Sequence, residues 1–275
     1  MAGIYFTGIN SGNGTSEYYV NISGTTSSDP YRIDNCVFNS GDFQVVHFNI
    51  SGNGPGLIDH CTFNGGGASE FIHNLGMGPS STAGWQDDVN PGTAAMLYIE
   101  NCYCNNVDST YIASFTQGYY ASRTCIRYCT LVFSQLDQHG GTTGTGARWF
   151  EFYNNTFIVP QNYNQSNFMA LRGGSGVVFN NVATGGPNLG GGDIQMYDES
   201  GGTIPAYLGR GINQTYSPVY LWNNTQNMQG GATYQYQPYI YPHPLDTNNG
   251  GSPTTPPSAS PAATPLAPTN LRITS

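Results

Sequence analysis

Lysine is absent from this chain, and charged residues of every kind are scarce. Only 8% of its 275 residues are charged, against about 25% in an average soluble protein, and all seven basic residues are arginine. With a net charge of −9, these few arginines cannot form the basic patch that binds nucleic acid or an anionic membrane. An anionic polysaccharide would also be repelled unless Ca²⁺ bridged it, so Ca²⁺ is the only cofactor to consider. A neutral or weakly acidic polysaccharide suits this surface better as a partner.

Long apolar runs are missing as well. No segment approaches the ~18 consecutive apolar residues of a membrane-spanning helix, so we expect no membrane insertion. Residues 1–6 contain neither the basic segment nor the long apolar stretch of a signal peptide. Because residues 3–7 already read as a strand, we interpret this start as that of a trimmed, secreted protein. A charge-poor composition rich in Tyr, Asn and Gly is typical of extracellular and cell-surface proteins, which favours the same location.

A short motif recurs along the chain, with an apolar residue, a second residue that is polar in most copies, a turn residue that is usually Asn, and then Cys or Asn. The copies are Ile33–Phe38, Ile58–Phe63, Ile99–Cys104, Ile126–Cys129, Phe152–Phe157, Val178–Val182 and Leu221–Thr225. Measured at the Cys/Asn position (36, 61, 102, 129, 155, 181 and 224), the spacings are 25, 41, 27, 26, 26 and 43 residues. The repeat is therefore about 26 residues long, with two insertions of roughly 16 residues near 76–91 and 185–214.

These repeats predict an all-β chain wound as a right-handed parallel β-helix of about eight coils. Coils that stack at ~4.8 Å align equal positions into columns, with apolar residues inward and polar residues outward. One predicted column contains Cys36, Cys61, Cys102, Cys129, Asn155, Asn181 and Asn224; the other contains Asn35, His60, Asn101, Tyr128, Asn154, Asn180 and Asn223. Asn tolerates a left-handed turn, so the second column is expected at a tight turn, with its amides hydrogen-bonded as a ladder.

Ile58-Asp59-His60-Cys61-Thr62-Phe63 resembles the stretch at the turn between two sheets in the pectate-lyase-like superfamily of β-helix proteins. The resemblance covers roughly residues 1–245 and implies the fold rather than an activity, because this stretch belongs to the scaffold. Tyr241-Pro242-His243-Pro244-Leu245 is similar to the end of the β-helix in bacterial members, where a Pro/Ser/Thr linker and another module follow. We therefore expect a β-helix domain, residues 1–246, and a linker with the start of a missing module or docking strand, residues 247–275.

Six cysteines are present, and their spacings do not match the C-x₂-C pairs of zinc sites. Two interpretations remain for them. They are inert thiols buried in a column, or a disulfide joins two of Cys102, Cys104, Cys125 and Cys129, since adjacent coils bring Cα atoms into disulfide range. A catalytic thiol is not expected, because no cationic partner is evident.

The strand that follows each turn carries the candidate functional residues. Aligned at a similar distance from the turn, His47 and His73 are expected to lie side by side on the outer face of adjacent coils. Two acidic residues precede these strands, and the first insertion adds an aromatic residue and two acids that would form a wall. The candidate catalytic residues are Asp87, Asp88, His47 and His73, and the candidate substrate-binding residues are Trp85, Glu70 and Asp42. The alternative is that these outward side chains are simply solvated.

Asp87-Asp88 together with Gln138-His139-Gly140-Gly141 resembles the polygalacturonase pattern of paired Asp followed by Gly-His-Gly. Gln138 stands in place of the first Gly, and the lysine of that family's later motif has no counterpart here. A polyuronate lyase would need a strong base and a cation beside the substrate carboxylate. The basic candidates near the middle of the chain are Arg123, Arg127, Arg148 and Arg172, and none stands in the lyase arginine motif. If the protein is an enzyme, a glycoside hydrolase therefore fits better than a lyase.

Two functions remain open at this point. The first is an extracellular β-helix protein that binds or cleaves a neutral or weakly acidic polysaccharide. The second is a non-catalytic structural surface protein, such as an adhesin, fibre or filament subunit, because no catalytic motif is complete and the ends of a solenoid offer strand edges for self-association. Tyr18-Tyr19, Tyr119-Tyr120 and the tyrosines of 234–241 either stack on sugar rings or pack against the scaffold.

Overall fold

The computed structural model describes most of the chain as strands and turns. The described residues are 5–9, 18–25, 30–40, 46–52, 55–65, 70–76, 90–106, 112–140, 146–163, 165, 167–185, 193–196, 208–209, 215–225 and 236–246. Within these ranges every regular element is a β-strand, which confirms the all-β prediction. The predicted linker, 247–275, lies outside them.

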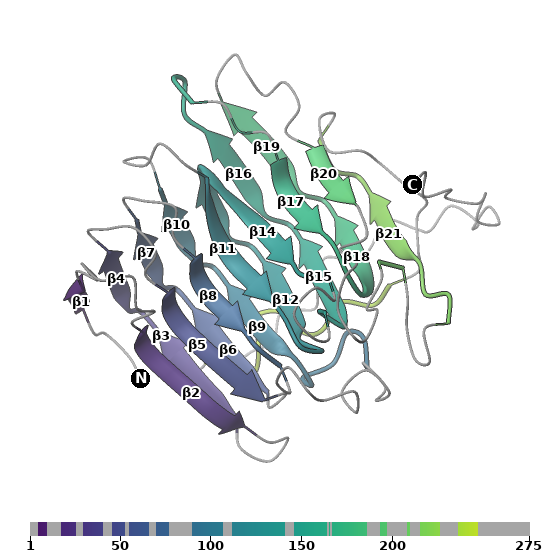
Figure 1. Ribbon diagram of the computed structural model, residues 1–275, viewed down its shortest axis with the longest axis horizontal. Helices are drawn as coiled ribbons and strands as arrows, with labels where there is room; N and C mark the ends of the chain where they lie inside the picture. The colour runs from purple at the N-terminus through teal and green to yellow at the C-terminus, as the bar shows by residue number, and fades with distance from the viewer. Residues whose placement is uncertain are drawn as a thin grey trace.

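Three parallel, seven-stranded sheets form the described fold, and successive strands belong to sheets 1, 2 and 3 in turn (Figure 1). Sheet 1 contains β1 (Tyr5–Ile9), β4 (Val37–Ser40), β7 (Thr62–Asn64), β10 (Tyr103–Asn105), β13 (Thr130–Val132), β16 (Thr156–Val159) and β19 (Val182–Gly185). Sheet 2 contains β2 (Tyr18–Thr25), β5 (Val46–Gly52), β8 (Glu70–Asn74), β11 (Ala113–Gly118), β14 (Ser134–Gln138), β17 (Asn167–Leu171) and β20 (Asp193–Met196). Sheet 3 contains β3 (Tyr31–Asp34), β6 (Gly56–Asp59), β9 (Leu97–Glu100), β12 (Arg123–Arg127), β15 (Trp149–Tyr153), β18 (Ser175–Phe179) and β21 (Val219–Trp222).

A residue in the left-handed conformation forms the turn between sheet 3 and sheet 1 in each copy of the motif. The backbone φ angle lies between 52° and 57° at Asn35, His60, Asn101, Tyr128, Asn154, Asn180 and Asn223. Asn is common there because its short polar side chain lowers the cost of this conformation. The following residues also stack, since the Thr62 amide donates to the Cys36 carbonyl and the Tyr103 amide to the Cys61 carbonyl, both at 2.9 Å. Both predicted columns are therefore confirmed.

The amide ladder lies one residue later than predicted. Asn155 Nδ2 donates to Asn181 Oδ1 at 3.0 Å, and Asn181 Nδ2 donates to Asn224 Oδ1 at 2.9 Å. Asn155 and Asn181 are buried, whereas Asn180 at the turn is exposed. Asn180 faces solvent, where water can satisfy its amide, whereas Asn181 faces the interior, where an unpaired amide would be costly.

Cysteine replaces Asn in the first half of this column and makes a weaker form of the same contact. Cys129 Sγ donates to the Ile99 carbonyl at 3.6 Å, just as Asn155 Nδ2 donates to the Ile126 carbonyl at 2.9 Å. All six cysteines are buried and free, so the interpretation as inert thiols is confirmed and the disulfide alternative is wrong. Burial raises the pKa of Cys104 to about 12, which keeps this thiol protonated at neutral pH.

The core is filled by side chains from all three sheets. Ile58 of sheet 3, Phe63 of sheet 1 and Phe115 of sheet 2 are each fully buried in one apolar cluster. The Phe63 and Phe115 rings meet edge to face, with centroids 5.4 Å apart. Each such side chain contributes about 1.5–3 kcal/mol through burial, which makes this shared interior the main stabilising feature of the fold.

Beyond β21, the chain runs back along the outer face of sheet 3. Residues 236–246, called the C-terminal strap below, contact Glu151 of β15, Arg127 of β12, Glu100 of β9 and Arg32 of β3 in that order. The strap therefore ties strands that are far apart in the sequence and ends beside β3. Its tyrosines pack against the scaffold, as one of the two sequence interpretations required.

The second predicted insertion is not a continuous loop. β20 occupies 193–196, inside the predicted range of 185–214, and it pairs with β17 in sheet 2. Polar and Gly-rich residues surround this strand, so the sequence pattern alone did not separate it from the loops on either side. The described sheets have seven strands each, whereas the repeat count suggested about eight coils.

Candidate functional site

The outer face of sheet 2 carries three columns of side chains across β8, β11, β14 and β17. The columns are Glu70, Ser114, Gln135 and Asn167; His73, Gln117, Asp137 and Ala170; and Leu75, Tyr119, His139 and Arg172. The backbone amides of Tyr119, His139 and Arg172 each donate to a carbonyl of the preceding strand, so the third column extends the sheet past the strand ends. The register shifts at Phe115 and Phe168, and both rings are buried in the core while their polar neighbours face outward.

Glu70 and His73 lie at the β8 end of this face and contact each other directly. His73 Nε2 donates to one oxygen of the Glu70 carboxylate, and Gln117 Nε2 donates to the other. Burial acts to raise the pKa of Glu70, but the bonds from His73 and Gln117 lower it more, so its pKa lies below the ordinary value. Glu70 is therefore ionised at neutral pH and acts as a hydrogen-bond acceptor or base there, not as a proton donor.

Tyr119 and His139 form an aromatic pair at the centre of the face. Their rings are stacked, with centroids 4.0 Å apart and planes 17° from parallel. The Tyr119 hydroxyl donates to Gln117 Oε1, which also lies 3.0 Å from His139 Nε2. Gln117 thus connects the aromatic pair to Glu70, and the bonds run from strand to strand across the face.

Arg172 and Asp137 close the other end of the same network. The Arg172 guanidinium donates to both oxygens of Asp137, at 3.0 and 2.6 Å, in the bidentate geometry of strong carboxylate pairs. Arg172 also donates to His139 Nε2, which can accept only while His139 is neutral. His139 Nε2 would donate to Gln117 Oε1 in the other neutral tautomer, with the proton on Nε2, so the tautomer of His139 selects its partner.

The face is partly open to solvent. The side chain of Glu70 is 37% exposed, His73 and His139 are each 16% exposed, and Asp137 and Arg172 are exposed by 7% and 13%. Donors, acceptors and one ring pair are thus fixed by their neighbours and accessible from outside. This arrangement can bind a polar ligand with little reorganisation of its side chains.

Two of the predicted site residues, Glu70 and His73, are brought together by the structure. Asp42, Trp85, Asp87 and Asp88 lie outside the described residues, as does the side chain of His47. The expected stacking of His47 on His73 is wrong at the level of the backbone, because the register places Asn49 opposite His73.

The physical reason for this error is the connection between sheet 1 and sheet 2. A single residue, Phe133, joins β13 to β14, whereas residues 106–112 join β10 to β11. A fixed distance from the turn therefore does not locate equivalent positions in sheet 2. For the same reason, sequence reasoning missed Gln117 and Asp137, which lie in line with His73. His139 did have a signal, the Gln138-His139-Gly140 stretch, and its described partners include Arg172 and Gln117. The paired aspartates of that pattern, Asp87 and Asp88, lie outside the described residues.

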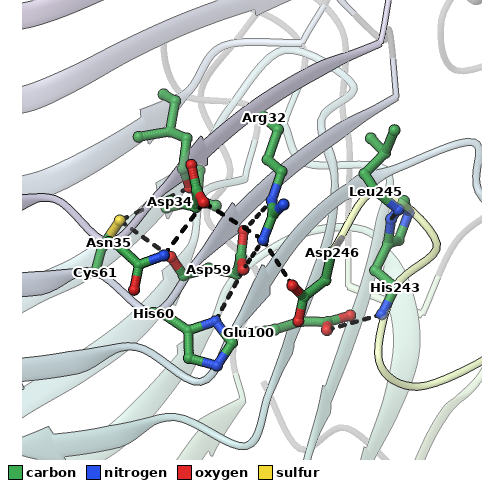
Figure 2. Close-up of polar contacts among 12 residues, drawn as sticks. Arg32, Asp34, Asn35, Asp59, His60, Cys61, Glu100, His243, Leu245 and Asp246 are labelled. Carbon is green, nitrogen blue, oxygen red and sulfur yellow. Dashed lines mark hydrogen bonds and ion pairs between the residues drawn. The ribbon is translucent and has the colours of Figure 1, made fainter. Parts of the chain in front are cut away.

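One other group of described residues brings possible metal ligands together, at the outer edge of sheet 3. Ligand atoms of Asp59, His60 and Asp246 lie within 4.8 Å of one another. Figure 2 shows Arg32 among them, donating to Asp59 at 2.9 and 2.7 Å and to Asp246 at 2.7 Å. A guanidinium in this position neutralises both carboxylates and would repel a cation, so these residues do not fit a metal site. The Ca²⁺ bridge considered from the sequence stays a prediction.

Comparison with protein-family models, with curated proteins and with solved structures found no match to the chain. Within its described part, the protein has no helix long and apolar enough to cross a membrane.

Proposed function

We infer that the chain is a right-handed parallel β-helix of the pectate-lyase-like kind. The regular alternation among three sheets and the parallel pairing of each strand with the third one after it support this inference. Connections between parallel strands of one sheet are right-handed in about 98% of cases, which supports the handedness. The column of left-handed residues at the sheet 3 to sheet 1 turn includes His60, inside the stretch that resembles the superfamily.

We propose that the outer face of sheet 2 binds a neutral or weakly acidic polysaccharide outside the cell. The observation that supports this most is the hydrogen-bonded row formed by Glu70, Gln117, Tyr119, His139, Arg172 and Asp137. Sugar hydroxyls donate and accept hydrogen bonds, and the row offers both kinds of partner in fixed positions. The Tyr119 ring adds an apolar surface of the type that packs against sugar rings.

Binding fits this site better than cleavage by a two-carboxylate mechanism. A glycoside hydrolase of that type needs one carboxyl group that stays protonated to act as the acid. Glu70 has a lowered pKa, and Asp137 accepts from Arg172 with both oxygens, so neither is poised to donate a proton at neutral pH. A catalytic role would instead fall to the histidines, with His73 beside Glu70 as the first candidate.

Tyr119→Ser should weaken glycan binding about tenfold or more, because it removes the stacking ring and the bond to Gln117. The purified 275-residue protein is screened on a glycan array, and the best ligand is then titrated against the wild type and the variant. Tyr103→Ser is the matched control, since Tyr103 is a 41% exposed aromatic residue on the outer face of sheet 1. Equal loss in both variants, or no bound glycan at all, would contradict the proposal.

Cleavage is measured in the same samples as the release of reducing ends. If the protein hydrolyses its ligand, Glu70→Gln should lower the rate by about 10²-fold while the titrated affinity changes much less. Full activity in Glu70→Gln would remove Glu70 from the chemistry but leave the binding proposal standing.

A structural surface protein is the second candidate, favoured by the outer face of sheet 1. Its outward positions from β4 to β19 are Val37, Asn39, Thr62, Asn64, Tyr103, Asn105, Thr130, Val132, Thr156, Ile158, Val182 and Thr184, none of them charged. Copies could therefore approach without repulsion on this side. However, six strands of about three residues offer only about 300 Å², well below the ~800 Å² per partner of a stable interface. If electron microscopy shows filaments and no glycan binds, the structural role becomes the better-supported function and glycan binding the second candidate.

A further inference from the structure

His243 is buried in the C-terminal strap with one ring nitrogen unpaired. Its exposed fraction is 3%, and its ring centroid lies 4.9 Å from that of Tyr98 on β9 and 5.2 Å from that of Tyr239. Nδ1 accepts a hydrogen bond from the Leu245 amide at 3.1 Å, which places the ring proton on Nε2 (Figure 2). Nε2 has no hydrogen-bond partner among the described residues. The docked strap is therefore built around a neutral imidazole.

A second proton on this ring would be unfavourable for three reasons. The Leu245 amide would lose its acceptor and face a new N–H group. The ring is 3% exposed, so burial deprives a charged imidazolium of the surrounding water that would stabilise it. Two cations, Arg127 of β12 and Arg32 of β3, lie near the ring. Burial first, and then these two arginines, lower the pKa of His243 to about 4 in the docked strap.

We infer that the C-terminal strap is an acid-sensitive latch, docked on sheet 3 while His243 is neutral and released when His243 takes up a proton. A histidine whose pKa is lower when docked favours docking above its ordinary pKa of 6.5 and loses that preference as the pH falls toward about 4. Each pH unit in this window lowers the docking equilibrium about tenfold. This inference is independent of the glycan proposal, because the strap lies on sheet 3 and not on sheet 2.

The other charged groups around the latch differ in their effect, because some favour docking of the strap at low pH and others change the pKa of His243. Glu100 accepts from the His243 amide at 3.1 Å, and burial raises its pKa, so proton uptake by Glu100 favours the docked strap. Asp246, which pairs with Arg32, acts to raise the pKa of His243. Asp59 shares Arg32 with Asp246. The two aromatic neighbours, Tyr98 and Tyr239, are neutral throughout this pH window because burial raises their pKa values.

Release of the latch would expose part of the outer face of sheet 3 and free the end of the strap. The strap buries Tyr98, Cys125 and Glu151, which form an apolar cluster and a carboxylate with a raised pKa. It also anchors residue 246 beside β3, at the opposite end of the stack from β21. Undocking would therefore expose this part of sheet 3 and separate Asp246 from Arg32, while the three sheets stay intact.

The latch is tested by hydrogen–deuterium exchange of the full chain between pH 7.5 and 4.5. Exchange rates are corrected for their intrinsic pH dependence, so that they report the opening equilibrium of each segment. Amides of the strap, Leu245 among them, should open about tenfold more per pH unit below 6.5. Amides of β12 and β15 should keep their protection over the same range, which distinguishes release of the strap from unfolding.

His243→Asn provides the decisive variant. The Asn side-chain oxygen can replace Nδ1 as the acceptor for Leu245 but does not titrate, so the strap should remain docked with no pH response. His73→Asn is the matched control, since His73 lies on sheet 2 beside Glu70 and Tyr119, and the pH response of the strap in this variant should equal that of the wild type. The latch proposal would be wrong if strap exchange in the wild type does not depend on pH, or if it depends on pH equally in His243→Asn. Loss of protection in strap and sheets together would also contradict it.

Discussion

Arg127→Met should lower the free energy of unfolding by about 3–5 kcal/mol, because it leaves the buried carboxylate of Glu100 without its partner. Both side chains are 0% exposed, and Arg127 donates to Glu100 through Nε and Nη2. The same guanidinium donates to the carbonyls of Tyr239 and Ile240 in the strap at 2.6 and 2.8 Å. One substitution therefore removes an ion pair and two of the bonds that hold the strap. Guanidinium-induced unfolding of the wild type and the variant gives the difference.

A double variant separates the unpaired charge from the lost packing. Arg127→Met with Glu100→Gln should be more stable than Arg127→Met alone, since replacing both members of a buried pair with neutral groups is often close to neutral. Arg127→Lys should not rescue the protein, because a single ammonium cannot reach Glu100, Tyr153 and the strap carbonyls together. If the double variant loses the sum of the two single effects, the pair is not coupled and this account of Arg127 is wrong.

The features that could be predicted from the sequence are those set by neighbouring residues. The left-handed turn favours Asn at one position, and the next position faces the core. Each copy of Asn35-Cys36 therefore shows in the sequence alone which residues stack on one another. The residue that carries the amide ladder was misplaced by one, because Asn180 and Asn181 are chemically identical. Only burial, which depends on the fold, distinguishes them.

The candidate site could be predicted only in part, because it depends on loop lengths. Glu70 and His73 lie on one strand, but a spacing of three residues would place them on opposite faces of a regular strand. They share the outer face because Phe71 and Ile72 between them are both buried. Which residue of the next strand lies beside His73 depends on the connection from sheet 1. That connection differs in length between coils, from the single residue Phe133 before β14 to the eight residues 10–17 before β2. Nothing local indicates that Gln117 is the neighbour. Contacts of the strap are harder still, since Arg32 and Asp246 are 214 residues apart in the sequence.

Asn181→Ala should be about as damaging as the loss of Arg127, lowering the free energy of unfolding by about 3 kcal/mol or more. Asn181 Oδ1 accepts from the backbone amide and the side-chain amide of Asn155, and its Nδ2 donates to the Phe152 carbonyl. Alanine leaves these buried groups unsatisfied, at about 1–3 kcal/mol each. Unfolding in guanidinium, followed through its midpoint and slope, measures the loss.

Two neighbouring substitutions test whether the ladder itself is responsible. Asn180→Ala, at the exposed turn, should cost only about 1 kcal/mol, the penalty of a left-handed alanine. Cys129→Asn should be neutral or stabilising, because its Nδ2 could donate to the Ile99 carbonyl that Cys129 Sγ already contacts at 3.6 Å and extend the ladder beyond Asn155. An Asn at position 129 that destabilises the protein as much as Asn181→Ala would mean that packing volume, and not the hydrogen-bonded column, decides which residue this position accepts.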